Sequence, residues 1–534
     1  MIGVEDLRLG AAKQRLSAQV CIIGSGPAGL ALCRALTERG VGVVLLEAGD
    51  AAPRLLEAAQ WPECLQHDYK GATLGRSFGL GGTSALWGGQ LLPLRPEEMR
   101  ARAHCGASAW PIRHQEIAAH YALIERWVGV VSAPYNLDAM TLSDHPLAQL
   151  DWNGLAPRFS KWIPMRRRNL ATAWLPGIIA SGRARVVINA TVQGWETVRR
   201  GDAAEVVKIL ARSDSDHQLE VEAPLCVICA GALESTRLAL ELSAKCPEGG
   251  SVNRALLGQG LQDHLSVRLG ELQPRAGSRF AALFAPFFSG STMRSLRLDL
   301  PPQLAEQEGL PAAYLHIVAE AAPNSGFAAV RDTLRSLQAH ELRRAVGHGL
   351  RGLGALPEVL ELLYGRAIRR RLLFPRRARL WVNLDFEQPQ QSENRLSLSE
   401  QCDASGRRRL QVRWSPPVCP ARLIAVMTRQ LQTCWQRNDL SAAAELKLFD
   451  AQKIAASMPD NLYDIYHPAR TTRMGASAQN GVVDPDLRLF GTTNCYVLSS
   501  SVFPSMGAAN PTFTLMALAL RLAAHLASAR ARSA

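Results

Sequence analysis

The sequence predicts an α/β protein in which a Rossmann-like parallel sheet is joined to at least one further domain. Three observations lead to this prediction. The chain has 534 residues, more than a single hydrophobic core usually organises. Residues 18–50 alternate between a buried strand, a glycine-rich turn, a helix and a second buried strand. The composition, 47% hydrophobic and 20% charged, is typical of a folded globular protein.

The first element in chain order is a turn suited to a dinucleotide. Gly24, Gly26 and Gly29 form a G-x-G-x-x-G motif after an apolar strand and before a helical segment. The three glycines allow a tight turn, close approach of a pyrophosphate and close helix–strand packing. Glu47 ends the next strand, where a carboxylate can accept both ribose hydroxyls. The candidate contacts are Gly24, Ser25, Gly26, Ala28, Gly29 and Glu47. The motif alone does not distinguish FAD from NAD.

The loop GLGGTSALWGG, residues 79–89, is too glycine-rich for a helix or a sheet interior. With the residues that follow, it resembles the flavin-facing loop of the glucose–methanol–choline (GMC) oxidoreductases. The resemblance implies FAD, with the loop main chain against the flavin ring. Leu86 stands where some relatives attach the flavin through His, so noncovalent FAD is implied. A structural Ω-loop packed by Trp87 is the alternative. The candidate contacts are Gly81, Gly82, Thr83, Ser84, Leu86 and Trp87.

Two further segments are similar to GMC signatures. Residues 223–243 read as a buried strand, a turn at Gly231 and a helix, and Gly231 and Val192 are further candidate cofactor contacts. In GQGLQDHLSV, residues 258–267, we interpret Asp263 and His264 as structural, because a polar pair at a strand start usually stabilises the fold.

The C-terminal segment holds the candidate catalytic pair. His467 and Asn510 match the catalytic base of the GMC family and its hydrogen-bonding partner. An imidazole with a near-neutral pKa can take a hydroxyl proton, and the Asn amide can hold the same oxygen. Ser500, Pro511 and Thr512 are candidate cofactor contacts, and Thr512 can cap the helix that follows.

Two positions depart from the family pattern. Arg470 stands where Gly is usual, and Ser499 where Gly or Asp is common. We expect Arg470 either to turn outward or to add positive charge near the flavin or the substrate.

The two ends of the chain must meet to build one FAD site, so the resemblance implies a discontinuous FAD-binding domain. We assign residues 15–100, 186–270 and 456–530 to this domain, 101–185 to a substrate or cap segment, and 271–455 to a substrate domain with an antiparallel sheet backed by helices. Residues 184–198 and 203–212 read as a meander attached to the main sheet. Residues 380–388 and 394–400 supply two strands of the substrate sheet, and residues 110–130 are helical.

Residues 340–379 are rich in arginine and have an apolar helical face that includes Leu356, Leu360 and Leu363. Three interpretations stay open. The segment is a solvated basic helix packed on the substrate domain, a weak contact to a membrane surface or an acidic partner, or a lid for an anionic substrate.

We predict an FAD-dependent oxidoreductase that converts a hydroxyl of a sugar, glycoside or aminocyclitol-type alcohol to a carbonyl. The same chemistry on an apolar or sterol-like alcohol, and a non-redox lyase on this scaffold, are the alternatives. An NAD-dependent dehydrogenase would need no loop like 79–89. The electron acceptor stays open between oxygen, a quinone and a protein, and no metal site is predicted.

The net charge of +13 comes without a nucleic-acid-binding motif, so no nucleic-acid partner is expected. A cytoplasmic location is expected because the N-terminus lacks the apolar core of a signal peptide and no apolar run is long enough to span a membrane. The eleven cysteines have no framework spacing, and the C-x-x-C at 226–229 lies in a predicted buried strand.

Overall fold

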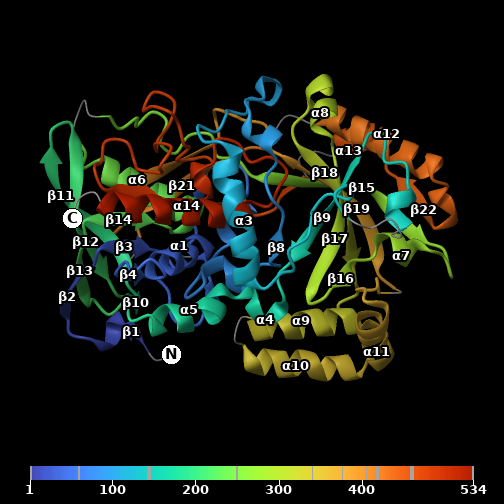
Figure 1. Cartoon of the computed structure of the whole chain (residues 1–534), viewed down its shortest axis with the longest axis horizontal. Coiled ribbons are helices and arrows are strands. Elements are labelled where there is room, and N and C mark those ends of the chain that lie inside the picture. The colour runs from blue at the N-terminus through green and yellow to red at the C-terminus, as the bar shows by residue number, and fades with distance from the viewer. Residues whose placement is uncertain are drawn as a thin grey trace.

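The computed structural model describes residues 3–57, 60–140, 146–247, 251–338, 341–375, 377–403, 406–416, 420–456 and 462–531. Figure 1 shows a parallel sheet flanked by helices in one half of the molecule and a large antiparallel sheet in the other. Segments from both ends of the chain meet in the first half. The predicted α/β class is confirmed.

The parallel sheet has six strands among the described residues. Its order is β1 (Val4–Asp6), β10 (Ala184–Ile188), β4 (Val43–Leu46), β3 (Val20–Ile23), β14 (Leu225–Ile228) and β24 (Cys495–Val497). Every residue of β3 and β4 is buried, as expected for strands covered by helices on both faces. Ile23 pairs with Leu46 on one side and Ile228 on the other. This register brings the ends of three strands to one edge of the sheet.

Two helices cover the first strands. α1 (Pro27–Thr37) follows the glycine-rich turn and packs against α14 (Pro511–Ala531), the last helix of the described chain. The C-terminal segment therefore supplies both an edge strand and a covering helix to the N-terminal nucleotide-binding unit.

The predicted meander divides between two sheets: its first strand, β10, joins the parallel sheet as expected, and the rest forms a sheet of its own. The strands are β11 (Thr191–Arg200), β12 (Ala203–Arg212), β13 (Gln218–Glu222) and β2 (Lys13–Ser17). Asn189 lies between β10 and β11 at a φ of 55°, in the left-handed region that Asn tolerates in turns. The chain leaves the parallel sheet at this turn, so β11 cannot continue the parallel ladder.

The antiparallel sheet has nine strands within the described residues. The path is β22 (Ala444–Leu448), β15 (His264–Pro274), β19 (Arg379–Glu387), β18 (Ala313–Glu320), β17 (Thr292–Asp299), β9 (Ala156–Trp162) and β8 (Gln90–Leu91); β16 (Phe287–Ser289) pairs with β17 and β23 (Tyr463–Asp464) with β15. α12 (Ala421–Arg437) buries Leu423, Met427 and Leu431 in the core of this half. The expected antiparallel sheet backed by helices is therefore present.

The second strand predicted for this sheet lies elsewhere. β20 (Arg395–Cys402) pairs with β21 (Arg408–Arg413), which pairs in turn with β6 (Glu63–Cys64) in a separate three-stranded sheet. The remaining strands, β5 (Arg54–Leu55) and β7 (Ser77–Phe78), pair with each other. Two strands also cross the predicted domain limits, since β8 and the start of β15 belong to the antiparallel sheet.

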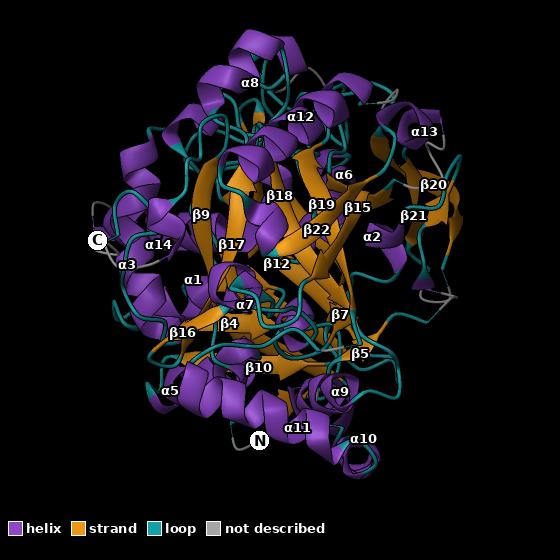
Figure 2. Cartoon of the chain, turned by 90° about the vertical axis from the view of Figure 1, so that its right-hand side faces the viewer, coloured by secondary structure: helices purple, strands orange, loops and turns teal. Residues whose placement is uncertain are grey.

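The other helices surround these sheets (Figure 2). They are α2 (Lys70–Thr73), α3 (His114–Val128), α4 (Met165–Arg168), α5 (Leu170–Ala180), α6 (Gly231–Ser243), α7 (Phe280–Phe284), α8 (Pro302–Glu308), α9 (Gly326–Gln338), α10 (Leu342–Leu353), α11 (Leu356–Tyr364) and α13 (Ala451–Ala456). In the described part of the chain, none of the helices combines the length and the apolar character needed to cross a membrane. Cys226 and Cys229 are buried in and just after β14, as predicted.

Candidate active site

A cavity of about 230 Å³ opens at the glycine-rich turn, where three distant parts of the chain converge. Its lining includes these predicted contacts: Gly24, Ser25, Gly26, Ala28, Glu47, Gly82, Thr83, Val192, Gly231, His467, Ser500, Pro511 and Thr512. At Gly26 a Cβ would find no atom within 4 Å, so the main chain at the start of α1 faces open space. Such a glycine at a helix N-terminus is suited to a pyrophosphate.

The carboxylate of Glu47 is already bonded within the protein. One oxygen accepts hydrogen bonds from Ser25 N at 3.0 Å and Ser25 Oγ at 2.6 Å, and the other from Gly49 N at 2.9 Å and Gly79 N at 3.2 Å. A carboxylate offers about four acceptor positions. Glu47 therefore ties the dinucleotide turn to the loop that begins at Gly79, and a ribose hydroxyl would share these oxygens.

The loop 79–89 lies over the dinucleotide turn. Gly81 N donates to Ser25 Oγ at 3.3 Å, and a Cβ on Gly82 would come within 3.1 Å of Gly26 Cα. Both glycines have positive φ, 92° and 50°, so the close approach needs residues without a side chain.

Some predicted contacts lie outside the wall of this cavity: Gly29, Gly81, Ser84, Leu86, Trp87 and Asn510. A Cβ on Gly29 would lie 1.9 Å from Gly24 O, so this glycine serves helix–strand packing. Trp87 Nε1 donates to Arg168 O at 2.8 Å, and Leu86 is 42% exposed. The cofactor contacts of these residues stay predictions.

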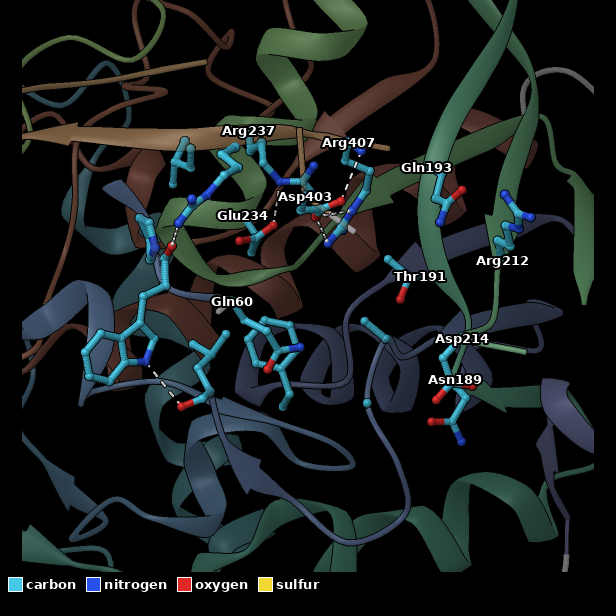
Figure 3. Close-up of a pocket in the computed structure, with 18 of the residues that line it drawn as sticks. Gln60, Asn189, Thr191, Gln193, Arg212, Asp214, Glu234, Arg237, Asp403 and Arg407 are labelled. Atoms are coloured by element: carbon cyan, nitrogen blue, oxygen red, sulfur yellow. Dashed lines mark hydrogen bonds and ion pairs between the residues drawn. The ribbon is translucent and has the colours of Figure 1, made fainter. Parts of the chain in front are cut away.

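A second cavity, of about 610 Å³, adjoins the first and shares Ala48, Thr191 and Glu234 with it. Figure 3 shows its polar lining, drawn from the strand ends, the β11–β12 region and the segment around Arg407. Two ion pairs frame it, Arg237–Glu234 at 2.7 Å and Arg407–Asp403 at 2.9 Å. The two cavities adjoin beside Glu47, and the polar side chains of the larger one suit the adenosine end of a dinucleotide.

The contacts of the His467 and His264 rings show which ring nitrogen of each carries a proton. His264 Nε2 lies 2.7 Å from Gly507 O, and only an N–H can approach a carbonyl oxygen in this way. The neutral His264 ring therefore carries its proton on Nε2 and accepts at Nδ1. His467 Nδ1 lies 2.9 Å from that acceptor, so it carries a proton. This leaves Nε2 of His467 as the unprotonated nitrogen.

Both rings are held in the neutral form. Burial lowers the pKa of His264. Burial, together with the neighbouring His264, lowers the pKa of His467 to about 3. The expected near-neutral pKa of His467 is thus corrected, because a half-buried imidazole beside a buried neighbouring ring loses part of the hydration that stabilises its charge. The ring is ready to accept a proton across the physiological pH range.

Asp263 holds the main chain of His264 and His467 in place. Its Oδ1 accepts from His264 N at 2.7 Å and His467 N at 2.8 Å, and its Oδ2 accepts from Tyr69 OH at 2.5 Å. Burial and the nearby Asp464 raise the pKa of Asp263. Asp263 therefore has the predicted structural character, whereas His264 also contacts the ring of the candidate base.

Asn510 is oriented by a residue that the sequence did not reveal. Arg297 Nη1 donates to Asn510 Oδ1 at 2.8 Å, and Arg297 Nη2 donates to Ala508 O at 2.7 Å. A guanidinium has donors only, so the atom facing it must be the amide oxygen. The amide hydrogens are then the groups that Asn510 can offer to a substrate oxygen.

Arg470 does not turn outward, and its expected contribution of positive charge near the flavin or the substrate stays a prediction. It is buried, its Nη2 donates to Gln390 Oε1 at 2.6 Å, and its Nε donates to Pro504 O at 3.2 Å. Its φ of 79° lies in the left-handed region that glycine adopts most readily. Burial, with Arg473 nearby, lowers its pKa to about 9. Ser499 lines the cavity and lies 2.5 Å, Oγ to Oγ, from Ser501.

The positioning partners were missed for a simple reason. Arg297 lies in β17, in a part of the chain without a legible motif, and only the tertiary fold brings it to Asn510. His264 was noted in the sequence, but its contact with His467 spans 203 residues. No local pattern predicts such a contact.

Comparisons with known proteins bear on the family and the cofactor of this chain. A family model described as GMC oxidoreductase matches residues 390–519, and one described as FAD binding domain matches residues 17–59. Choline oxidase from Arthrobacter globiformis is 41% identical over 98 residues, a match that spans 18% of this chain and 18% of that enzyme.

Solved structures share the whole fold at low sequence identity. Pyridoxine 4-oxidase from Mesorbium loti has a TM-score of 0.58 at 16% identity, covering 95% of this chain and 99% of that one. A fungal aryl-alcohol oxidase has a TM-score of 0.55 at 14% identity, covering 96% and 99%. Aspergillus oryzae formate oxidase has a TM-score of 0.56 at 13% identity, covering 97% and 99%.

Proposed function

Because the chain belongs to the GMC oxidoreductase family and binds FAD, we propose that it oxidises a hydroxyl group of a small-molecule alcohol to a carbonyl. The observation that carries the proposal is the tautomer of His467, whose Nε2 is the unprotonated atom of a half-buried ring on the cavity wall. When bound, FAD supplies the acceptor for the hydride that such an oxidation releases.

Four side chains have separate roles in this proposed reaction. His467 Nε2 accepts the hydroxyl proton, and the amide of Asn510 donates to the same oxygen, which sets the direction of the substrate C–O bond. Arg297 holds the amide in this orientation, and His264 holds the His467 tautomer. The His264 ring is buried, so its contact with His467 is shielded from water.

For the substrate class we propose a polar, hydroxyl-rich alcohol such as a sugar, glycoside or aminocyclitol. The support comes from the polar surroundings of Arg297. Its guanidinium lies over the Tyr314 ring at 3.1 Å from the centroid, and Tyr314 OH donates to Asp385 Oδ2 at 2.5 Å. These buried groups suit hydroxyl partners better than a sterol-like body.

We also propose noncovalent FAD, supported by Leu86 in the loop 79–89, and a cytoplasmic location, supported by ten free cysteines among the described residues.

The test is anaerobic mixing of the FAD-loaded protein with a panel of alcohols, followed by the loss of flavin absorbance. His467→Ala should keep FAD and slow this reduction by about 10²- to 10⁴-fold, the usual contribution of a general base. Asn510→Ala should lose less, because it orients the oxygen without taking its proton. Reduction of the His467→Ala flavin at the wild-type rate would place the base elsewhere. Flavin that no alcohol reduces, in a protein that cleaves a cyanohydrin, would instead favour a lyase.

A further inference from the structure

The helices α9, α10 and α11 form a layer at the outer edge of the molecule. Figures 1 and 2 show α9 and α10 side by side, with α10 as the outermost element. α10 turns Ala345 and Gly352 inward, and a Cβ on Gly352 would lie 3.6 Å from Ala329 of α9. One side of α10 is therefore used for packing, and most of the remaining surface of the helix is exposed.

The exposed surface of residues 342–368 carries many apolar side chains. Nine large hydrophobic side chains, each 48–68% exposed, form what we term the apolar patch: Leu342, Val346, Leu350, Leu353, Leu356, Leu360, Leu363, Tyr364 and Ile368. Spacings of four, four and three residues place the four members on α10 along one side of the helix. Of the three interpretations left open for residues 340–379, this exposure favours a surface contact. Contiguous exposed patches of this kind mark interaction sites.

The charge around the apolar patch selects the kind of partner. Residues 340–379 contain ten arginines and three glutamates. Exposed arginines lie on α10 and at the end of α11: Arg343, Arg344, Arg351, Arg366, Arg369 and Arg370. A second copy of the chain would bring the same positive charge against itself. A negatively charged partner is favoured instead.

We propose that the apolar patch docks on the surface of an anionic lipid bilayer. An amphipathic helix with apolar side chains on one side and arginines beside them lies in the membrane interface, with its apolar side among the acyl chains. Arginine side chains lie along apolar surface and extend their guanidinium groups to lipid phosphates. The outermost position of α10 allows this contact without rearrangement of the fold (Figure 2).

The docked layer is connected to the loop 79–89. Gln338, the last residue of α9, donates from Nε2 to Ser84 O at 3.0 Å and to Trp87 O at 3.1 Å. The orientation of the loop relative to the bilayer is therefore set by direct hydrogen bonds.

The test is sedimentation of the FAD-loaded full-length protein with lipid vesicles. The probe vesicles are phosphatidylcholine with about one quarter phosphatidylglycerol, and the reference vesicles are phosphatidylcholine alone. We expect strong binding to the anionic vesicles that weakens between about 0.1 M and about 0.5 M salt. Leu350→Glu combined with Leu360→Glu should lower the bound fraction by about tenfold or more, since two apolar side chains no longer enter the bilayer. Arg351→Glu combined with Arg369→Glu should remove the preference for anionic lipid.

Matched controls lie on β11, in the opposite half of the molecule (Figure 1). Val198→Glu and Arg199→Glu change an exposed apolar and an exposed basic residue and should leave binding unchanged. FAD content and melting temperature establish that each variant is folded. Equal binding of the wild type to both vesicle types would overturn the proposal. Unchanged binding of the double variant Leu350→Glu, Leu360→Glu would also overturn it. A wild-type dimer that this variant converts to a monomer would assign the apolar patch to a second copy. Loss of vesicle binding in both control variants would also refute it.

Discussion

Replacing His264 by Leu should separate the orientation of the catalytic base from the base itself. The change keeps a buried apolar volume but removes the nitrogen that accepts the Nδ1 proton of His467 across 2.9 Å. That proton would then lack its buried acceptor, and the alternative tautomer, with Nε2 protonated, could no longer take a proton from the substrate. Leaving a buried donor unpaired costs about 1–3 kcal/mol, which corresponds to roughly 5- to 150-fold in the rate of flavin reduction.

The pH dependence gives an independent readout. His264 is one of the groups that lower the pKa of His467, after burial. Without it the pKa of His467 should move up toward its ordinary value. Because the neutral ring is the active form, the rate falls as pH drops through this pKa, so the fall should begin at higher pH in the variant than in the wild type.

Rapid mixing with one alcohol substrate between about pH 4 and about pH 8 measures both effects. His264→Asn is the matched control, since its amide oxygen can accept the His467 proton, and it should recover most of the rate. A His264→Leu variant with the wild-type rate and an unshifted profile would refute this tautomer assignment. A slower rate with an unshifted profile and a lowered melting temperature would reduce His264 to a structural role.

Three further predictions concern the cofactor and the orienting arginine. Acid precipitation should release all FAD into the supernatant, and yellow colour in the pellet would contradict the noncovalent assignment based on Leu86. Glu47→Gln should lower both FAD retention and melting temperature, because its amide group would face two of the four present donors; a cost of about 1–3 kcal/mol is expected from fluorescence titration and thermal melts. Arg297→Lys should retain FAD but slow flavin reduction by about tenfold or more, because the paired contacts to Asn510 and Ala508 are lost. An unchanged rate in this variant would show that Asn510 is oriented by other groups.

The parts of the fold that could be predicted are those encoded over short stretches. The strand, turn and helix around Gly24 follow from glycine geometry and apolar runs, and the structure confirms them. Motifs predict the roles of His467 and Asn510. The structure adds the tautomer of His467, which a motif does not specify. The role of Arg297 could not be predicted, because Arg297 lies on a strand from another part of the chain and only the fold brings it to Asn510.

Periodicity has a related limit in residues 342–364. The helical repeat of Leu356, Leu360 and Leu363 identifies an apolar face, but it does not say what covers that face. The sequence left packing on the protein, a surface contact and a substrate lid open, and in the structure these side chains are exposed. In the same way, alternation predicted residues 394–400 as a strand but not which sheet it would join.

The arrangement of the parallel sheet has a consequence for synthesis of the chain. β24 and α14 come from residues 495–531, so the ribosome makes them after the other five strands of this sheet. A nascent chain can form β3, β4 and α1 early, but the cavity wall at Ser500, Pro511 and Thr512 does not exist until these residues have been made. Loading with FAD therefore has to wait for this segment, and a fragment that ends before residue 495 should emerge without its cofactor.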